Sequence, residues 1–296
     1  MIRRILGLLA ALGAVVAMVV ILPSTASAAE CAAPWNSSSV YTGGGAASYN
    51  GHNWTAKWWT QNETPGSSDV WADQGSCGGG GTDPGDPGSS SDFVVSEAQF
   101  NQMFPGRNSF YTYSGLVAAL DAYPGFANTG SDTVKKQEAA AFLANVSHET
   151  GGLVYIVEQN TANYPHYCDS SQPYGCPAGQ AAYYGRGPIQ LSWNFNYKAA
   201  GDALGIDLLG NPYLVEQDAA VAWKTGLWYW NTQNGPGTMT AHNAIVNGAG
   251  FGETIRSING SIECNGGNPA QVQSRIDKYQ AFVSILGTTP GSNLSC

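Results

Sequence analysis

Apolar side chains recur at three- and four-residue intervals along most of the chain after residue 92, and this spacing predicts α-helices. Ser96 and Ser114 stand where helix-capping residues are expected, and Asn268 followed by Pro269 is typical of a helix start. The predicted helices cover residues 97–104, 115–122, 132–148 and 216–233 and the segment from Pro269 to about Leu286. No alternation of strands and helices accompanies them, so the pattern favours a mainly α fold.

The stretch from residue 30 to residue 77 has a different pattern, because aromatic residues are interspersed there with Gly, Asn and Ser. Such turn-rich segments favour a few short strands rather than helices. A block of this size forms only a marginal core, which a Cys31–Cys77 bridge would strengthen. Its tryptophans exceed what that core needs, so we expect one or two to face solvent. They are Trp35, Trp54, Trp58, Trp59 and Trp71.

Residues 78–91 separate these two patterns and consist of Gly, Thr, Asp, Pro and Ser. No apolar side chain occurs there that could be buried, so the segment is expected to be a flexible linker. We therefore predict a small domain over residues 30–77 and a large domain over residues 92–296.

The first 29 residues have the order of a secretory signal peptide, with two arginines, an apolar run over residues 5–22 and an alanine-rich end. A membrane anchor is the alternative, since the apolar run approaches the ~20 residues that span a bilayer. The alanine site, Pro23 and the lack of a second apolar run favour cleavage after Ala28 or Ala29. We therefore expect secretion, and no membrane association after cleavage.

The charge of the chain argues against two classes of binding partner. The formal net charge is −9 and only 11% of the residues are charged, a poor basis for binding nucleic acid or anionic lipid.

The cysteines are expected to form disulfides. Secretion permits disulfides, and six cysteines allow fifteen connectivities. The sequential pairing keeps every bridge within one composition block and is the one we expect; it joins Cys31–Cys77, Cys168–Cys176 and Cys264–Cys296.

Several common chemistries lack their motifs in this sequence. The four histidines form no H-E-x-x-H pattern, because Thr150-Gly151-Gly152 follows His148-Glu149, and no G-x-S-x-G occurs. Nucleotide-binding glycine motifs are also missing. The sequence therefore predicts no metal, no cofactor and no serine nucleophile.

A pair of glutamates offers acid–base chemistry instead. Glu149 ends the predicted helix 132–148, where the negative end of the helix dipole favours a protonated carboxyl and hence a general acid. Glu158 lies nine residues later in a polar setting that suits an ionised base. Two glycines after Glu149 permit the chain to turn back, although the spacing alone does not fix the separation of the carboxyls.

Residues 183–197 are rich in aromatic rings and amides, which suits a sugar. Side chains such as Gln190 and Asn196 can bond hydroxyl and acetamido groups, and rings such as Trp193 can stack on sugar faces. Ser192 has a simpler alternative role as the cap of the following helix.

Three motifs in this order make the chain resemble the catalytic domain of glycoside hydrolase family 19 chitinases. They are His148-Glu149-Thr150-Gly151-Gly152, Tyr184-Gly185-Arg186-Gly187-Pro188-Ile189-Gln190-Leu191-Ser192 and Ile258-Asn259-Gly260-Ser261-Ile262-Glu263-Cys264. The resemblance covers nearly all of residues 92–296. It implies a lysozyme-like, two-lobed helical catalytic domain that cleaves β-1,4-linked N-acetylglucosamine internally with inversion.

The resemblance also implies roles for individual residues. Glu149 corresponds to the general acid, Glu158 to the general base, and Ser192 to the residue that helps hold the attacking water. Gln190, Trp193, Asn196 and Asn259 are expected to bind substrate, and His148, Glu263 and Arg275 to support the catalytic carboxylates. Without the family, Arg275 alone would be interpreted as a surface salt-bridge residue. The stretch between acid and base is shorter than in plant members, which is typical of the bacterial form with a more open cleft.

The block at residues 30–77 resembles the small chitin-binding modules of bacterial chitinases, so that a small β-rich carbohydrate-binding module precedes the catalytic domain. Trp58 and Trp59 correspond to the binding pair, and both can be exposed only if the backbone is irregular, since neighbours on a strand face opposite sides. We expect a monomer that binds chitin and N-acetylglucosamine oligosaccharides. A peptidoglycan hydrolase and an inactive, lectin-like chitin-binding protein are the alternatives.

Overall fold

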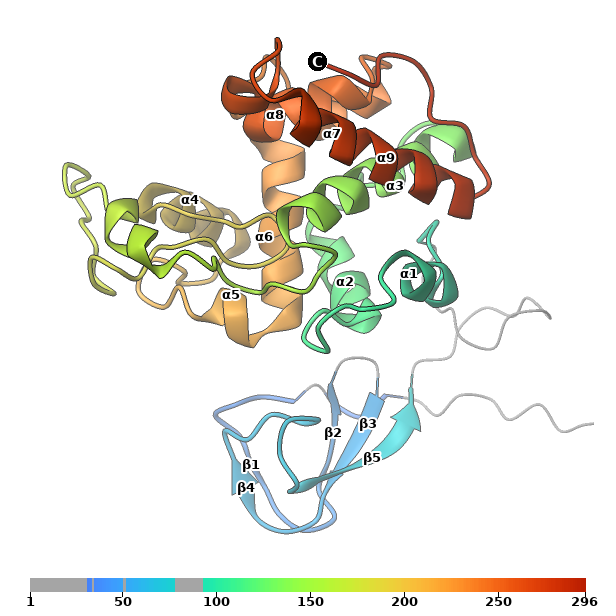
Figure 1. Ribbon diagram of the computed structural model, residues 1–296. Helices are drawn as coiled ribbons and strands as arrows, with labels where there is room; N and C mark the ends of the chain where they lie inside the picture. Colours follow the sequence, from blue (N-terminus) through green and yellow to red (C-terminus); the bar gives the residue numbers. More distant parts are fainter. Residues whose placement is uncertain (1–30, 34, 50–51, 78–92) are drawn as a thin grey trace, which may run out of the picture.

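The computed structural model describes residues 31–33, 35–49, 52–77 and 93–296. The predicted signal peptide and linker lie outside these described residues. Short strands occupy the first part and helices the second, as the sequence predicts (Figure 1). Among the described residues, no helix is both long enough and apolar enough to cross a membrane.

The small β module contains a three-stranded antiparallel sheet in the order β2-β3-β5 and a β1-β4 ribbon. The strands are β1 (Val40–Tyr41), β2 (Ala46–Tyr49), β3 (His52–Ala56), β4 (Thr60–Gln61) and β5 (Trp71–Ser76). Ala47, Ala56, Val70 and Trp71 form its core. A disulfide between Cys31 and Cys77 joins the two ends of this module.

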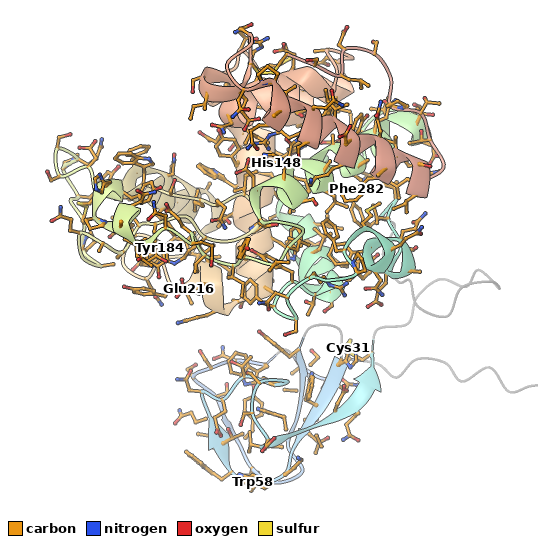
Figure 2. The ribbon with its side chains drawn as sticks, viewed as in Figure 1. Cys31, Trp58, His148, Tyr184, Glu216 and Phe282 are labelled. Carbon is orange, nitrogen blue, oxygen red and sulfur yellow. A yellow bond between two sulfur atoms is a disulfide. The ribbon has the colours of Figure 1, made fainter. Side chains whose placement is uncertain are left out.

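Two tryptophans of this module face solvent. Trp58 and Trp59 are 56% and 60% exposed and lie in the bend between β3 and β4, outside any strand (Figure 2). Their exposure agrees with the expected surplus of tryptophan, and the bend is the irregular backbone that lets neighbouring rings both reach solvent.

The second part of the chain is built from helices and two 3₁₀ segments. They are α1 (Glu97–Met103), α2 (Tyr113–Ala119), η1 (Leu120–Ala122), α3 (Asp132–Glu149), η2 (Thr161–Tyr167), α4 (Asn194–Leu204), α5 (Leu214–Gln217), α6 (Ala219–Thr232), α7 (Ala241–Val246), α8 (Phe251–Glu263) and α9 (Pro269–Ile285).

Capping residues set most of these helix starts, and two starts differ from the prediction. Ser96 caps α1 through a capping box, and Asn268 caps α9 with Pro269 in the first turn. Ser114 does not begin a helix, because Thr112 caps α2. The predicted helix 216–233 is two helices, since Asp218 ends α5 and caps α6 with its carboxylate.

The helices enclose two hydrophobic cores, which correspond to the two lobes of a lysozyme-like fold. The larger core involves α1, α2, α3, α7, α8 and α9, with α3 and α9 packed along each other. The smaller core lies among α4, α5 and the segment around Tyr183. Helix α6 contributes to both, Trp223 and Trp230 to the first and Trp228 to the second. Most of its residues are therefore buried, while Lys224 and Asn231 stay partly exposed.

Candidate active site

Glu149 is the last residue of α3, where the chain reverses. The amide of Gly152 donates to the carbonyl of Ser147, and Thr150 Oγ1 accepts from the amide of Leu153. Gly151 and Gly152 adopt φ of +62° and +85°, which most side chains would make unfavourable. The two glycines thus turn the chain back at the helix end, with the Glu149 carboxyl part-exposed beyond the last turn.

Arg275 joins Glu149 to a second carboxylate. Its Nε and Nη2 donate to the two oxygens of Glu263 at 2.8 Å each, its Nη1 donates to Asn145 Oδ1 at 3.0 Å, and Nη2 also contacts Glu149 Oε1. Only 1% of the Arg275 side chain is exposed, so its interpretation as a surface residue is wrong. Asn259 Nδ2 donates to Glu263 at 2.7 Å. Helices α3, α8 and α9 therefore meet in one network.

The charges of this network shift the titration of its members. Burial alone would raise the pKa of Glu263, but the hydrogen bonds and charge of Arg275 and the amide of Asn259 hold it below its usual value. His148 bonds Ser274 Oγ through Nδ1 at 3.2 Å. Burial and the charges of Arg275 and Lys278 lower the pKa of His148 to about 4, so the imidazole is neutral near pH 7.

Glu158 lies on the segment that pairs with residues 185–187. The amide of Glu158 donates to the Gly185 carbonyl at 2.9 Å, and the Gly187 amide donates to the carbonyl of Ile156 at 2.8 Å. Asn163 Nδ2 and the Tyr167 hydroxyl donate to Glu158 Oε1 at 2.8 and 3.1 Å. The carboxylate is therefore held by two side chains of η2.

The sugar-compatible segment continues from this pairing into α4. Gln190 Nε2 donates to the carbonyl of Gly187 at 3.0 Å, which ties the amide to the loop. Gln190 and Trp193 have φ of +52° and +74°, a conformation unusual for residues other than glycine. Trp193 occupies the cap position of α4, so Ser192 does not cap this helix. Asn196 Nδ2 donates to the Ser192 carbonyl at 3.0 Å and fixes the backbone that carries the serine.

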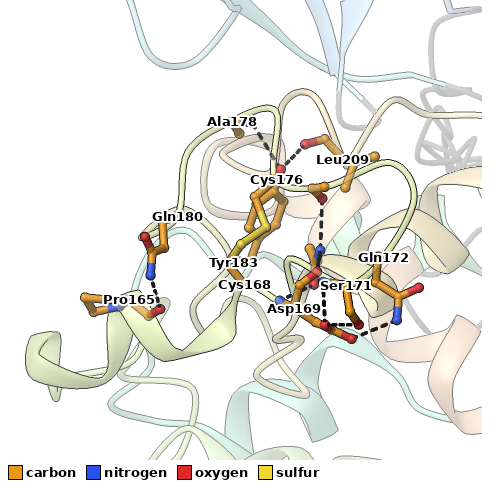
Figure 3. Close-up of a disulfide and its surroundings, with 12 residues drawn as sticks. Pro165, Cys168, Asp169, Ser171, Gln172, Cys176, Ala178, Gln180, Tyr183 and Leu209 are labelled. Atoms are coloured by element: carbon orange, nitrogen blue, oxygen red, sulfur yellow. Dashed lines mark hydrogen bonds between the residues drawn. A yellow bond between two sulfur atoms is a disulfide. The ribbon is translucent and has the colours of Figure 1, made fainter.

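A disulfide hairpin borders this segment. Cys168 and Cys176 are bonded, and the Tyr183 hydroxyl joins the amide of Ala178 to the carbonyl of Leu209 (Figure 3). The Trp193 ring packs edge-on against Tyr167 at 5.6 Å, which connects the hairpin side to the partners of Glu158.

The predicted site residues fall into two groups. Hydrogen bonds join Glu149, Glu263, Arg275 and Asn259 at the edge of the larger core, with His148 next to Glu149 in the chain. Glu158, Gln190, Ser192, Trp193 and Asn196 lie on contiguous segments beside the smaller core. In α6, burial and the charge of Glu149 raise the pKa of Tyr229 to about 12, and its hydroxyl donates to the carbonyl of Ser257 at 3.0 Å.

Sequence reasoning missed three polar side chains around the two carboxylates. Asn163 and Tyr167 donate to Glu158, and Asn145 accepts from Arg275, which contacts Glu149. Asn145 carries a usable signal, since it is a polar residue one turn before Glu149 on a helix that is otherwise apolar there. Asn163 and Tyr167 lie in a 3₁₀ segment without periodicity, so no pattern in the sequence indicates them. Among the described residues, no group of three His, Cys, Asp or Glu side chains could hold a metal ion.

Comparisons with known proteins identify the families that the two parts of the chain match. The sequence model of glycoside hydrolase family 19, described as chitinase class I, matches residues 94–296, and carbohydrate-binding module family 5/12 matches residues 34–72. The chain is 46% identical to endochitinase A of Zea mays over 211 residues, 69% of this chain and 71% of the maize protein.

Solved structures that resemble this chain are also chitinases. The chain is similar to chitinase C from Streptomyces griseus HUT6037, with 78% identity over 90% of this chain and 100% of that chain and a TM-score of 0.69. A class IV family GH19 chitinase from Zea mays is 45% identical over 69% of this chain and 98% of that chain, with a TM-score of 0.61.

Proposed function

The chain belongs to the family 19 chitinases, and from this membership we propose that it hydrolyses chitin with inversion, using Glu149 as general acid and Glu158 as general base. The observation that carries the proposal is the different setting of the two carboxyls. Glu149 contacts a buried arginine at the edge of one core, and Glu158 is bonded by neutral donors beside the other.

The surroundings of Glu149 stabilise the charge that remains after proton transfer, whereas the sequence predicts a setting that favours the protonated carboxyl. When Glu149 protonates the bridging oxygen, it acquires a negative charge next to the Arg275 guanidinium. Because Glu263 and Asn145 hold that guanidinium in place, it is already oriented toward the developing charge. His148 is neutral near pH 7, so Arg275 is the cation that faces Glu149 in this step.

Glu158 takes the proton of a water on the opposite face of the sugar ring. Asn163 and Tyr167 both donate to Oε1 of Glu158. Oε2 lies 3.5 Å from the Gly185 amide and is available for that water. Ser192 supplies a hydroxyl to orient the water. Room for the water requires carboxyls ~6.5–9.5 Å apart, against ~5 Å in a retaining enzyme.

Substrate binding is assigned to polar and aromatic side chains around this pair. Asn259 comes from the first group, and Gln190, Trp193 and Asn196 from the second. Trp58 and Trp59 of the β module would stack on a chitin chain and raise the local substrate concentration. We assign residues 30–77 and 92–296 to separate domains and expect a secreted monomer, in keeping with the signal-like residues 1–29.

The test is proton NMR of a chitin hexasaccharide during the first minutes of hydrolysis, with Glu149→Gln, Glu158→Gln and the exposed Glu97→Gln as a matched control. Initial α-anomer, two inactive variants and an active control are expected. Initial β-anomer would remove Glu158 from the base role. A wild type that cleaves bacterial walls but not chitin, or binds chitin without cleaving it, would contradict the whole assignment.

A further inference from the structure

We propose that a stacked column of Tyr164, Tyr184 and Arg186, anchored by Glu216, holds the segment that carries Glu158, so that Tyr164 is a positioning residue for the general base. The inference rests on the proposed role of Glu158. It concerns residues that take no part in the acid–base steps described above.

Arg186 is the fixed end of the column. Its side chain is fully buried, and its Nε donates to Glu216 Oε2 at 2.6 Å. Its Nη1 donates to the carbonyl of Ala182 at 2.7 Å and to the Tyr197 hydroxyl at 2.8 Å. These bonds fix the plane of the guanidinium in the smaller lobe.

The third nitrogen of the Arg186 guanidinium has no hydrogen bond within the part of the chain that the structure describes, and the face of the guanidinium packs on an aromatic ring. Nη2 has no hydrogen-bond partner among the described residues, which is costly for a buried charged group. The guanidinium carbon lies 3.5 Å from the centre of the Tyr184 ring, so the cation interacts with the π face of that ring. The Tyr184 hydroxyl donates to Glu216 at 3.2 Å, and Figure 2 shows these two residues in the same region.

Tyr164 extends the column on the other side of Tyr184. The two rings are 3.6 Å apart at 12°, which is a parallel stack. Tyr164 lies in η2, a short 3₁₀ segment that contains Pro165 and has no side-chain cap. Such a segment has little hydrogen bonding of its own to fix its place. The ring stack therefore ties η2 to a buried arginine that is held through its Nε and Nη1.

The column reaches Glu158 through η2 and through the backbone. The Tyr164 hydroxyl donates to the Glu158 carbonyl at 2.9 Å, and the same segment supplies Asn163 and Tyr167 to the carboxylate. On the other side, the backbone of Arg186 pairs with that of Val157 in an isolated antiparallel β-bridge, next to Glu158. The column thus connects η2 with the segment around Arg186, and Glu158 contacts both. A displaced η2 would move Asn163 and Tyr167, which donate to the Glu158 carboxylate.

The test compares Tyr164→Leu, which removes the stack, with Tyr164→Phe, which keeps it and loses only the hydroxyl. Tyr164→Leu is expected to lower kcat on a soluble chitin hexasaccharide about 10- to 100-fold while KM changes less than about twofold, because a misplaced base affects the chemical step. Tyr164→Phe should recover kcat to within about threefold of wild type. Tyr174→Leu, in the neighbouring disulfide hairpin, is the matched control and should be fully active.

A double variant separates positioning from general loosening. If both rings act through one column, Tyr164→Leu with Tyr184→Leu will have a kcat close to the lower single variant, not the product of both losses. Melting temperatures are measured for every variant, so that kcat refers to folded enzyme. Full activity of Tyr164→Leu, or independent losses in the double variant, would overturn the column while Glu158→Gln remains inactive. An active Glu158→Gln would overturn the base assignment, and this inference with it.

Discussion

Replacing Arg275 by methionine tests both the stability and the chemistry of the network at the end of α3. The guanidinium is 1% exposed and makes four contacts, two with Glu263 and one each with Asn145 and Glu149. Methionine keeps an unbranched apolar stem but removes every one of these contacts. The Glu263 carboxylate, itself only 3% exposed, then retains Asn259 as its donor.

The cost follows from the charge left behind. Removing one partner of a buried ion pair costs about 3–5 kcal/mol, because the other charge stays buried without compensation. For a domain of this size, 1 kcal/mol corresponds to a change of about 2–4 °C in melting temperature. We therefore expect Arg275→Met to melt about 6–20 °C below wild type at pH 7. Since the pKa of Glu263 is lowered in the folded state, this difference shrinks as the pH falls through that pKa.

A second substitution separates the two effects. Adding Glu263→Gln to Arg275→Met removes the buried charge, so about 2 kcal/mol or more of stability should return. Activity should not return, since Glu149 still lacks the cation that stabilises its carboxylate after proton transfer. A charge-assisted hydrogen bond is worth about 1.5–3 kcal/mol, which corresponds to a kcat about 10- to 150-fold lower in both variants.

The assays are thermal unfolding by circular dichroism and initial rates on a soluble chitin hexasaccharide. A double variant that is no more stable than Arg275→Met would refute the argument from buried charge. A double variant that regains both stability and kcat would refute the role of the guanidinium in catalysis.

Three further results are expected. Alanine at both Trp58 and Trp59 should weaken binding to insoluble chitin at least about tenfold, equivalent to ~1.4 kcal/mol, while soluble-oligosaccharide kcat/KM, measured beside it, stays at the wild-type value. The hydrogen bond that His242 donates to the buried carboxylate of Glu138 raises the pKa of His242, so the stabilisation by this pair is complete below about pH 6.5 and is lost as the pH rises through the raised value. The melting temperature of His242→Asn should therefore approach that of wild type at high pH, and a constant gap would contradict this. Serine at Cys264 and Cys296 opens a 32-residue separation and should cost about 3–4 kcal/mol in a denaturant titration, whereas an unchanged midpoint would show that the C-terminal tail is held without the bond.

The helical cores were predictable because their periodicity is strong. The apolar positions of α9 mark its buried face, and Arg275 lies on that face between Val272 and Ile276. The same periodicity could therefore have identified it as buried, but a single charge in a helix is ordinarily read as a surface residue. Asp218 was harder to interpret, because a short polar residue within a long apolar run can be tolerated in a helix or can cap a new one.

The partners of Glu158 could not be predicted for a different reason. Asn163, Tyr164 and Tyr167 reach it because η2 folds back over the segment, where the Tyr164 ring stacks on Tyr184. This contact joins residues far apart in the sequence, and no local pattern encodes it. The motif around Arg186 could be recognised from the sequence, whereas its contact with η2 required coordinates.

Helix α6 serves as a rigid spacer between the two lobes. Since Trp223 and Trp230 complete one core and Trp228 the other, neither lobe could detach or tilt far without exposing an indole ring to water. The catalytic region should therefore unfold as one cooperative unit, with the amides of α6 among the last to exchange with solvent. Because α6 packs into both cores, beside which Glu149 and Glu158 lie, we expect the two carboxyls to keep nearly the same separation in the free and the sugar-bound protein.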